Sequence, residues 1–149
     1  MTVLDGRYVA VLATEDEDGS PYLSAVWFLW DGKHVYIATG GNTRKARNAD
    51  ARRRGAILVD ARGPGPLRGA AATGSLEVLR GDEARALNER VWAKYLTPQG
   101  LADPRVGGAI REHDDVTIRL EPERWRTWST AVDFGGAYEE PGQTFPLDG

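Results

Sequence analysis

The first forty residues alternate between short apolar runs and sharp turns, a pattern typical of antiparallel strands. Residues 8–14 form the first run, which stops at the acidic turn over residues 15–19. Residues 22–30 form the second run, and Asp31-Gly32 then predicts a hairpin turn into a third strand over residues 34–39. The sequence therefore predicts a three-stranded meander at the start of the fold.

The period of the pattern changes after the third strand. Thr43 is suited to be the N-cap of a helix over residues 44–54, which Gly55 is expected to end. A buried strand is expected over residues 56–60, before an exposed Gly-Pro loop at 63–66. Residues 70–78 then alternate small or apolar side chains with polar ones, which predicts a half-buried strand that another backbone or a ligand can approach closely.

The last third of the chain predicts one more helix and one more strand. Asp82 is expected to cap a helix whose apolar positions share one face, namely Ala84, Leu87, Val91, Trp92 and Tyr95. Residues 97–114 are expected to be loop with room for one short helical turn. A strand is expected over 116–120, stopped by Pro122, and an irregular tail from 131 to 149. The fold class is mainly β: one domain over 1–149, with about six strands and two helices in a small barrel.

Composition excludes several classes of function. The chain of 149 residues has no cysteine and two histidines, which argues against disulfides, thiol catalysis and a histidine-rich metal site, so no metal is expected. A net charge of −3 argues against a general nucleic-acid binder. No apolar run has the length of a membrane helix and the start is no signal peptide, so a cytoplasmic protein without a membrane partner is expected.

The segment over residues 36–48 carries the most informative chemistry. It consists of a strand, a glycine turn and a helix whose first turn holds Arg44, Lys45 and Arg47. Cations at a helix N-terminus oppose the helix dipole and cost a few tenths of a kcal/mol each. A bound anion, held by backbone N–H groups, a Thr hydroxyl and these cations, would remove the conflict, so we infer a phosphate site. A solvated, arginine-rich helix face is the alternative for this segment alone.

The same segment differs from the familiar phosphate-binding loops. It lacks the second glycine and the Lys-Ser/Thr of a P-loop, and the chain has no Gly-x-Gly-x-x-Gly fingerprint or Gly-x-Ser-x-Gly elbow. A phosphate site without hydrolytic residues suggests a phosphorylated cofactor that stays bound. No catalytic side chain can be named from the sequence.

The order strand, Thr39, glycine turn, Thr43-Arg44-Lys45, helix and Asn48, followed by an Ile-Leu-Val strand, resembles the pyridoxamine 5′-phosphate oxidase-like family. The resemblance spans about residues 5–128 and implies a split β-barrel that binds a flavin or a deazaflavin. It implies that Thr43, Arg44 and Lys45 hold the cofactor phosphate, with Ala38 and Thr39 presenting backbone and hydroxyl. It also points to Asn48 as an orienting residue, and to Ser24, Val26 and Trp128 as cofactor-binding positions.

The second strand departs from true pyridoxamine phosphate oxidases, since residues 23–28 contain no cation and residues 124–129 lack the vitamin-binding pattern. The chain is more similar to relatives that use the deazaflavin coenzyme F420. The resemblance thus implies an oxidoreductase that binds FMN or F420 non-covalently, transfers a hydride to or from a small organic substrate, and forms a homodimer with the cofactor at its interface. The rival is a non-catalytic carrier of flavin, deazaflavin or haem on the same barrel.

Overall fold

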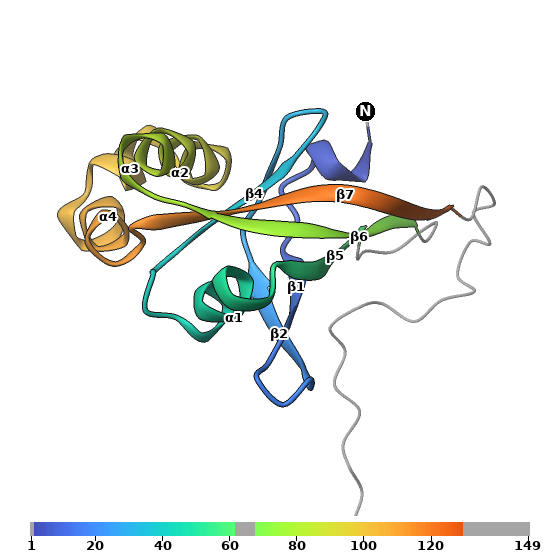
Figure 1. Ribbon diagram of the computed structural model, residues 1–149. Helices are drawn as coiled ribbons and strands as arrows, with labels where there is room; N and C mark the ends of the chain where they lie inside the picture. The colour runs from blue at the N-terminus through green and yellow to red at the C-terminus, as the bar shows by residue number, and fades with distance from the viewer. Residues whose placement is uncertain (1, 62–67, 130–149) are drawn as a thin grey trace, which may run out of the picture.

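The computed structural model describes residues 2–61 and 68–129, and the predicted 63–66 loop and the tail from 131 lie outside these ranges. The described residues confirm the mainly β class, with seven antiparallel strands curled into a half-barrel (Figure 1). In chain order the elements are η1 (Val3–Asp5), β1 (Ala10–Glu15), β2 (Pro21–Val26), β3 (Leu29–Trp30), β4 (Val35–Thr39), α1 (Arg44–Arg52), β5 (Arg54–Ala61), β6 (Arg68–Leu79), α2 (Gly81–Tyr95), α3 (Pro98–Ala102), η2 (Pro104–Gly108), α4 (Ala109–His113) and β7 (Val116–Ser129).

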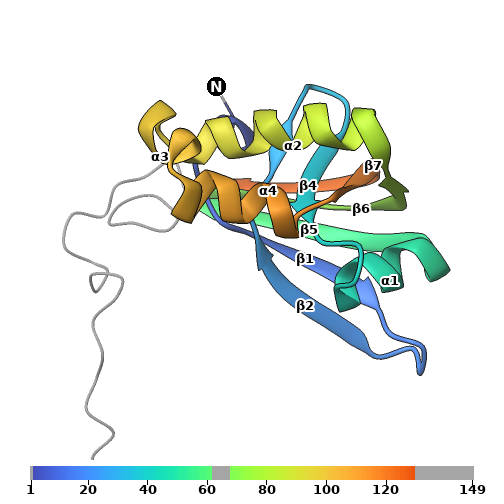
Figure 2. The same ribbon diagram turned by 90° about the vertical axis from the view of Figure 1, so that its left-hand side faces the viewer.

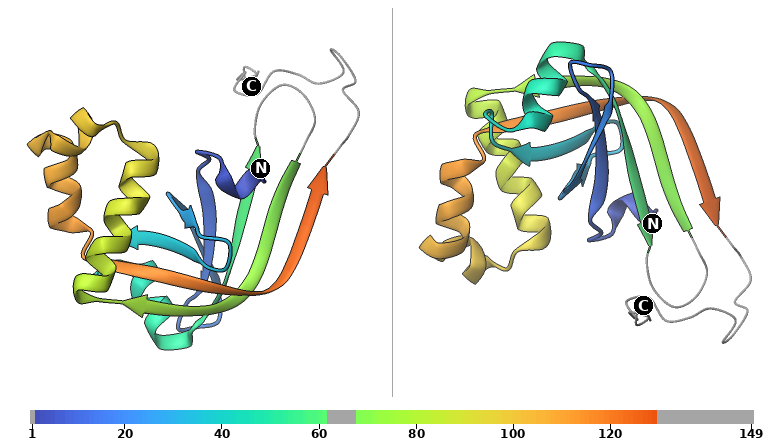
Figure 3. Two further views of the ribbon diagram at one scale, coloured as in Figure 1. Left: turned by 90° about the horizontal axis from the view of Figure 1, so that it is seen from above. Right: turned by 90° about the horizontal axis from the view of Figure 1, so that it is seen from below.

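The strands pair in the order β2-β1-β5-β6-β7-β4-β3, so β2 and β3 are the two edges of the sheet. The 12 residues of β6 and the 14 residues of β7 make its longest pair, which curves away from the helices (Figure 3). Apolar side chains on the concave side form the core. Its largest fully buried members are Leu12, Phe28, Val35, Ile37, Ile57, Val59, Ile118 and Leu120.

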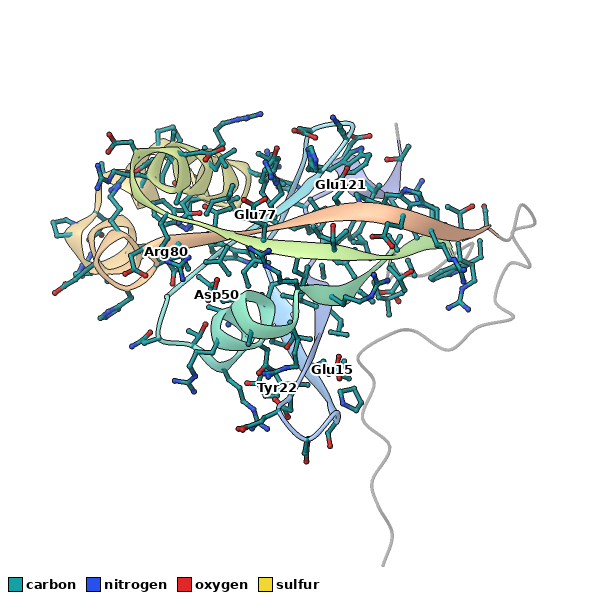
Figure 4. The ribbon with its side chains drawn as sticks, in the orientation of Figure 1. Glu15, Tyr22, Asp50, Glu77, Arg80 and Glu121 are labelled. Carbon is teal, nitrogen blue, oxygen red and sulfur yellow. The ribbon has the colours of Figure 1, made fainter. Side chains whose placement is uncertain are left out.

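The helices occupy two places around the sheet. Helices α2, α3 and α4 gather at one end of β6 and β7, where α2 and α4 lie side by side (Figures 1 and 2). Helices α1 and α2 lie on opposite sides of the long strands β6 and β7 (Figure 4). Helix α1 packs near the β1–β2 hairpin, which carries Glu15 and Tyr22. Arg80, just before α2, pairs with Asp50 of α1 at 3.2 Å and links the two helical regions.

The expected meander is wrong, because the run over residues 22–30 forms two strands rather than one. β2 pairs with β1, whereas β3 pairs with β4 at the opposite edge of the sheet. The chain passes from β2 at one edge of the sheet to β3 at the other through Phe28, whose side chain is fully buried. Its backbone N–H donates to the Tyr95 hydroxyl at 3.2 Å, and its carbonyl accepts from Lys94 Nζ at 3.1 Å. Side chains of α2 therefore replace the strand neighbour at this point.

Two predicted helices are confirmed, with changes at their ends. Thr43 caps α1 as predicted, but α1 ends at Arg52, where Arg53 takes a left-handed conformation with φ of 57°, rather than at Gly55. The prediction that Asp82 caps the second helix is wrong, since the N-cap of α2 is Arg80 and Asp82 lies in its first turn. An acidic residue in that turn still complements the helix dipole.

The expected loop over residues 97–114 is wrong as well, because the segment holds α3, η2 and α4. Each helix has five residues, too few to show a helical period in the sequence. Local caps stabilise them instead. Thr97 accepts from Gly100 N at 3.1 Å, and Asp103 accepts from Arg105 N at 2.8 Å.

β7 continues beyond Pro122, where the sequence predicted its end. A register shift between Thr73 and Gly74 of β6 lets the strand pass the proline, which lies opposite Gly74. A Cβ atom at Gly74 would lie 1.9 Å from the carbonyl oxygen of Glu121, so this close approach requires glycine. The bulge thus accommodates a residue that cannot donate a ladder hydrogen bond.

Gly74→Ala should destabilise the protein by about 3 kcal/mol or more, because backbone atoms of β7 must move to admit one methyl group. Chemical denaturation of the two proteins measures the difference. Gly32→Ala is a less crowded control, since nothing lies within 4 Å of a Cβ there, although its φ of 94° adds a smaller cost. Equal losses in the two variants would contradict the packing argument.

Candidate functional site

A pocket lies between the ends of β2 and β4 and is lined on one side by α2 and α4. Its volume of about 370 Å3 is in the range of small-molecule sites. We call it the Lys45 pocket. Its polar residues are Thr39, Lys45 and Asp114, and its apolar residues are Val9, Ala25, Val26, Trp27, Ala38, Val91, Trp92 and Ile110. Four predicted site residues, Val26, Ala38, Thr39 and Lys45, therefore share one cavity.

The junction of β4 and α1 positions the polar side of the pocket. β4 ends at Thr39, which is 3% exposed, and its hydroxyl lies 3.3 Å from that of Thr43. The Thr43 hydroxyl donates to the Gly40 carbonyl at 2.8 Å and accepts from Ala46 N at 3.3 Å. Thr43 thus fixes the start of α1, and this cap sets the directions of the Arg44 and Lys45 side chains.

The three cations at the start of α1 lie in different surroundings. Arg44 Nε donates to Asp16 Oδ1 at 2.9 Å, and its guanidinium lies 4.6 Å from the centre of the Tyr22 ring. Arg47 donates to the Asn42 carbonyl at 3.0 Å. Lys45 makes no hydrogen bond or ion pair with any residue in the described part of the chain, and it lines the pocket. The structure thus separates Lys45 from Arg44, which the sequence placed together on one phosphate.

Asn48 lies on the Arg44 side of α1 rather than in the Lys45 pocket. It is 5% exposed, and its Nδ2 donates to Asp16 Oδ1 at 2.8 Å and to Thr14 Oγ1 at 3.1 Å. Hydrogen bonds from Arg44 and Asn48 hold the pKa of Asp16 below its ordinary value. Asn48 thereby ties α1 to β1 and orients the helix as a whole.

Trp27 forms an aromatic wall of the pocket. Its ring stacks on Tyr95 of α2, with 4.8 Å between centroids and 5° between planes. The Tyr95 hydroxyl donates to the Tyr8 carbonyl at 2.8 Å, which fixes the stack. A rigid indole at the pocket wall suits a planar ligand ring.

Lys94, next to Tyr95 on α2, carries a partly buried ammonium. Its Nζ lies 3.7 Å from the centre of the Phe28 ring. Burial lowers the pKa of Lys94 from 10.5 to about 8, against the weaker opposite effect of Asp5. Lys94 lies next to Tyr95, whose ring stacks on Trp27, and its ammonium therefore loses a proton more easily in the folded protein than in water.

The free energy of unfolding should rise from pH 8 toward 10.5, because in this window the unfolded chain binds the Lys94 proton and the folded protein does not. Lys94→Met should flatten this rise and increase stability at pH 7 by roughly 1–2 kcal/mol, a figure reduced for partial exposure. Urea denaturation at pH 7 and 9.5 measures both effects. Lys33→Met, at an exposed turn, is the control, and the same pH profile in wild type and Lys94→Met would contradict the prediction.

Ser24 and Trp128, two further predicted site residues, lie outside the Lys45 pocket. Ser24 pairs with Leu12 on β1, and its Oγ is buried without a hydrogen-bond partner. Trp128 pairs with Gly69, whereas Val116 at the other end of β7 pairs with Thr39. At about 3.3 Å per residue, roughly 40 Å of strand separates Trp128 from the pocket of the same chain. Their binding roles stay predictions.

Sequence reasoning missed the contribution of α2, α4 and the α4–β7 link to the pocket. Val91 and Trp92 had been placed on the buried face of the second helix, and Ile110 and Asp114 in a loop. The sequence signal for Asp114 is its position two residues before the predicted last strand. Strand pairing across residues 39 and 116 is not visible in the sequence alone.

An apolar surface covers the convex side of the sheet beside the pocket. The register places Ala25, Val11, Leu58 and Ala71 in one row across β2, β1, β5 and β6. Leu23 and Val9 on the same side are 63% and 54% exposed. We call this surface the outer apolar face, formed by Val9, Val11, Ala13, Leu23, Ala25, Ala56, Leu58 and Ala71. Val9 and Ala25 also line the pocket, so the two features are continuous.

The family profile described as pyridoxamine 5′-phosphate oxidase matches residues 1–129, most of the chain. The chain belongs to this family. The resemblance stated from Thr39, Thr43, Arg44 and Lys45 is thereby confirmed at the level of the family. No curated protein matches the chain. Within the described residues, no helix has the length and apolar character needed to cross a membrane.

Solved structures with the fold of the oxidase family include three instructive cases. A conserved hypothetical protein from Mycobacterium tuberculosis is 24% identical, with a TM-score of 0.70 over 91% of this chain and 89% of that one. An F420 reductase is 25% identical, with a TM-score of 0.65 over 83% of this chain and 93% of that one. A FAD-binding protein from Mesorhizobium loti is 21% identical, with a TM-score of 0.64 over 87% and 91%.

Proposed function

We propose that the Lys45 pocket binds the phosphate-bearing part of FMN or coenzyme F420, and that the protein uses the cofactor to transfer a hydride to or from a small organic substrate. The observation that carries the proposal is that the Lys45 ammonium makes no hydrogen bond or ion pair with a described residue and lines a pocket with Thr39 and a stacked Trp27. Lys45 is half-buried, and a ligand phosphate could accept charge-assisted hydrogen bonds from its ammonium. The 25% identity to an F420 reductase supports the same class of ligand.

The residues of the pocket suit a phosphorylated ring compound better than haem. Lys45 offers a phosphate the cation that charge-assisted hydrogen bonding requires, and Thr39 lines the same pocket. Among the described residues that line the pocket there is no His, Cys, Met or Tyr, the common protein ligands of haem iron. This lining favours the flavin or deazaflavin class over the haem carrier.

The bound cofactor would supply the hydride chemistry, and the chain would supply position and exclusion of water. Lys45 and Thr39 would fix the phosphate end. Trp27, held by Tyr95, would limit the orientations open to a planar ring. The apolar residues of α2 and α4 would keep water from that side of the pocket.

We propose that a second copy of the chain completes this site by covering the outer apolar face. Monomeric proteins rarely leave a continuous apolar surface of this kind in water. Because Val9 and Ala25 belong to both features, a copy docked on the face would also close the margin of the pocket. A homodimer with the cofactor at its interface follows from this arrangement.

Spectroscopic titration tests the function directly. Purified protein should bind FMN or F420 with a change in cofactor absorbance, and should bind riboflavin more weakly because riboflavin has no phosphate. Oxidation or reduction of the bound cofactor that depends on an added substrate would establish an enzyme. Tight binding without turnover across a panel of small oxidants would instead favour the carrier, and no binding of either cofactor would refute the proposal.

A further inference from the structure

Asp114 is the second charged group of the Lys45 pocket. It follows α4 and directly precedes the link into β7, where its backbone carbonyl accepts from Asn88 Nδ2 at 3.2 Å. The same amide donates to the Val116 carbonyl at 3.0 Å, and Asn88 is 1% exposed. This buried clamp holds Asp114 at the pocket wall.

Asp114 also lines a second cavity, of about 380 Å3, which shares Trp92 with the Lys45 pocket. The charged groups around Asp114 are Lys45 from α1, Glu112, His113 and Asp115 near it in the chain, and Arg85, Glu89 and Arg111, which line the second cavity. Arg85 pairs with Asp82 at 2.9 Å, and Arg111 pairs with Glu89 at 3.1 Å. Lys45 is therefore the nearby cation that has no carboxylate partner of its own.

Burial raises the pKa of Asp114 above its ordinary value, and the charge of Lys45 is the largest effect that opposes the rise. The ionised carboxylate thus depends on Lys45 for part of its stability. An anion that binds to Lys45 would neutralise that charge and add negative charge near Asp114. Both changes favour the protonated carboxyl.

We propose that Asp114 is a specificity-determining residue that takes up a proton when an anionic group binds to Lys45. The inference rests on the proposed function, because it requires the phosphate to lie in the Lys45 pocket. Asp114 would then make the affinity depend on the charge of the ligand. A phosphate-bearing ligand would bind with proton uptake, whereas an uncharged analogue would bind without it.

Calorimetric titration of the full chain with FMN, in two buffers that differ in ionisation enthalpy, counts the protons exchanged. Between pH 5 and 7 we expect wild type to take up a net fraction of a proton per FMN. Asp114→Asn should take up none, and it can release a small fraction because the FMN phosphate itself titrates near pH 6. FMN affinity should therefore fall as the pH rises in wild type, and this fall should be smaller in Asp114→Asn.

His113→Gln controls for the neighbouring imidazole and should keep the wild-type proton count. The same count in wild type and Asp114→Asn would overturn the inference while leaving the proposed function intact. Loss of the uptake in His113→Gln would assign it to the imidazole and also overturn it. Should Asp114→Asn not fold, the wild-type comparison of FMN with riboflavin decides, since equal proton exchange overturns the inference. No binding of FMN or F420 to wild type would refute the proposed function and this inference together.

Discussion

Replacing Lys45 with methionine should weaken FMN binding about 10- to 100-fold and leave riboflavin binding nearly unchanged. The loss corresponds to one charge-assisted hydrogen bond, worth roughly 1.5–3 kcal/mol. Riboflavin has no phosphate for Lys45 to hold, so its affinity reports the ring contacts alone. Stability should stay level or rise slightly, because removing a cation from the first turn of α1 relieves an unfavourable dipole contact. Fluorescence titration at fixed ionic strength measures each affinity.

Two arginines of the same helix give matched controls. Arg47→Met removes an equal charge from an exposed side chain whose one hydrogen bond within the described residues is to the Asn42 carbonyl, and it should change FMN affinity little. Arg44→Met tests the sequence-based expectation that Arg44 and Lys45 hold the phosphate together. Because Arg44 pairs with Asp16, we expect a smaller loss than for Lys45→Met. Unchanged FMN affinity in Lys45→Met would remove the phosphate site from this pocket.

Leu23→Arg should convert a homodimer into monomers and abolish measurable cofactor binding. Leu23 is 63% exposed on the outer apolar face and does not line the Lys45 pocket. A charge buried without a partner at the centre of an interface commonly costs several kcal/mol, and a symmetric dimer suffers the cost twice. Sedimentation at micromolar concentration gives the oligomeric state, and FMN titration of the same samples gives the binding.

Val106→Arg is the matched control for this substitution. Val106 is 37% exposed in η2, away from the outer apolar face, so its replacement should leave both assembly and binding unchanged. A wild-type monomer that retains its cofactor would defeat the dimer proposal. A monomeric Leu23→Arg that binds FMN normally would show that the site is complete within one chain.

Sequence reasoning succeeded where a structure depends on neighbours in the chain. The β4–α1 junction was predicted because Thr43, the glycine turn and the helix behind it are contiguous, and the cap geometry needs nothing else. The pocket positions Ala38, Thr39 and Lys45 came from the same segment. The half-buried character of β6 was equally local, since Ala70, Ala72 and Leu76 alternate with exposed or partly exposed positions.

Sequence reasoning failed where distant residues decide the structure. The run over 22–30 breaks because Phe28 bonds to Tyr95, which lies 67 positions away. Pro122 does not end β7 because Gly74 in another strand admits a bulge there. Asp114 belongs to the pocket only because β7 pairs with β4, and no local period reveals that pairing.

The strand order has a consequence for the time course of folding. β2 and β3 are adjacent in sequence, yet they form opposite edges of the sheet and six strand pairings separate them. On its inner side, β4 pairs with β7, the last described strand. During synthesis, β4 must therefore wait until residues 116–120 have left the ribosome. Pairings that span so much chain give high contact order, which slows folding to about milliseconds or seconds. The β1–β2 hairpin can form early, but the half-barrel can close only after its last described strand enters between β6 and β4.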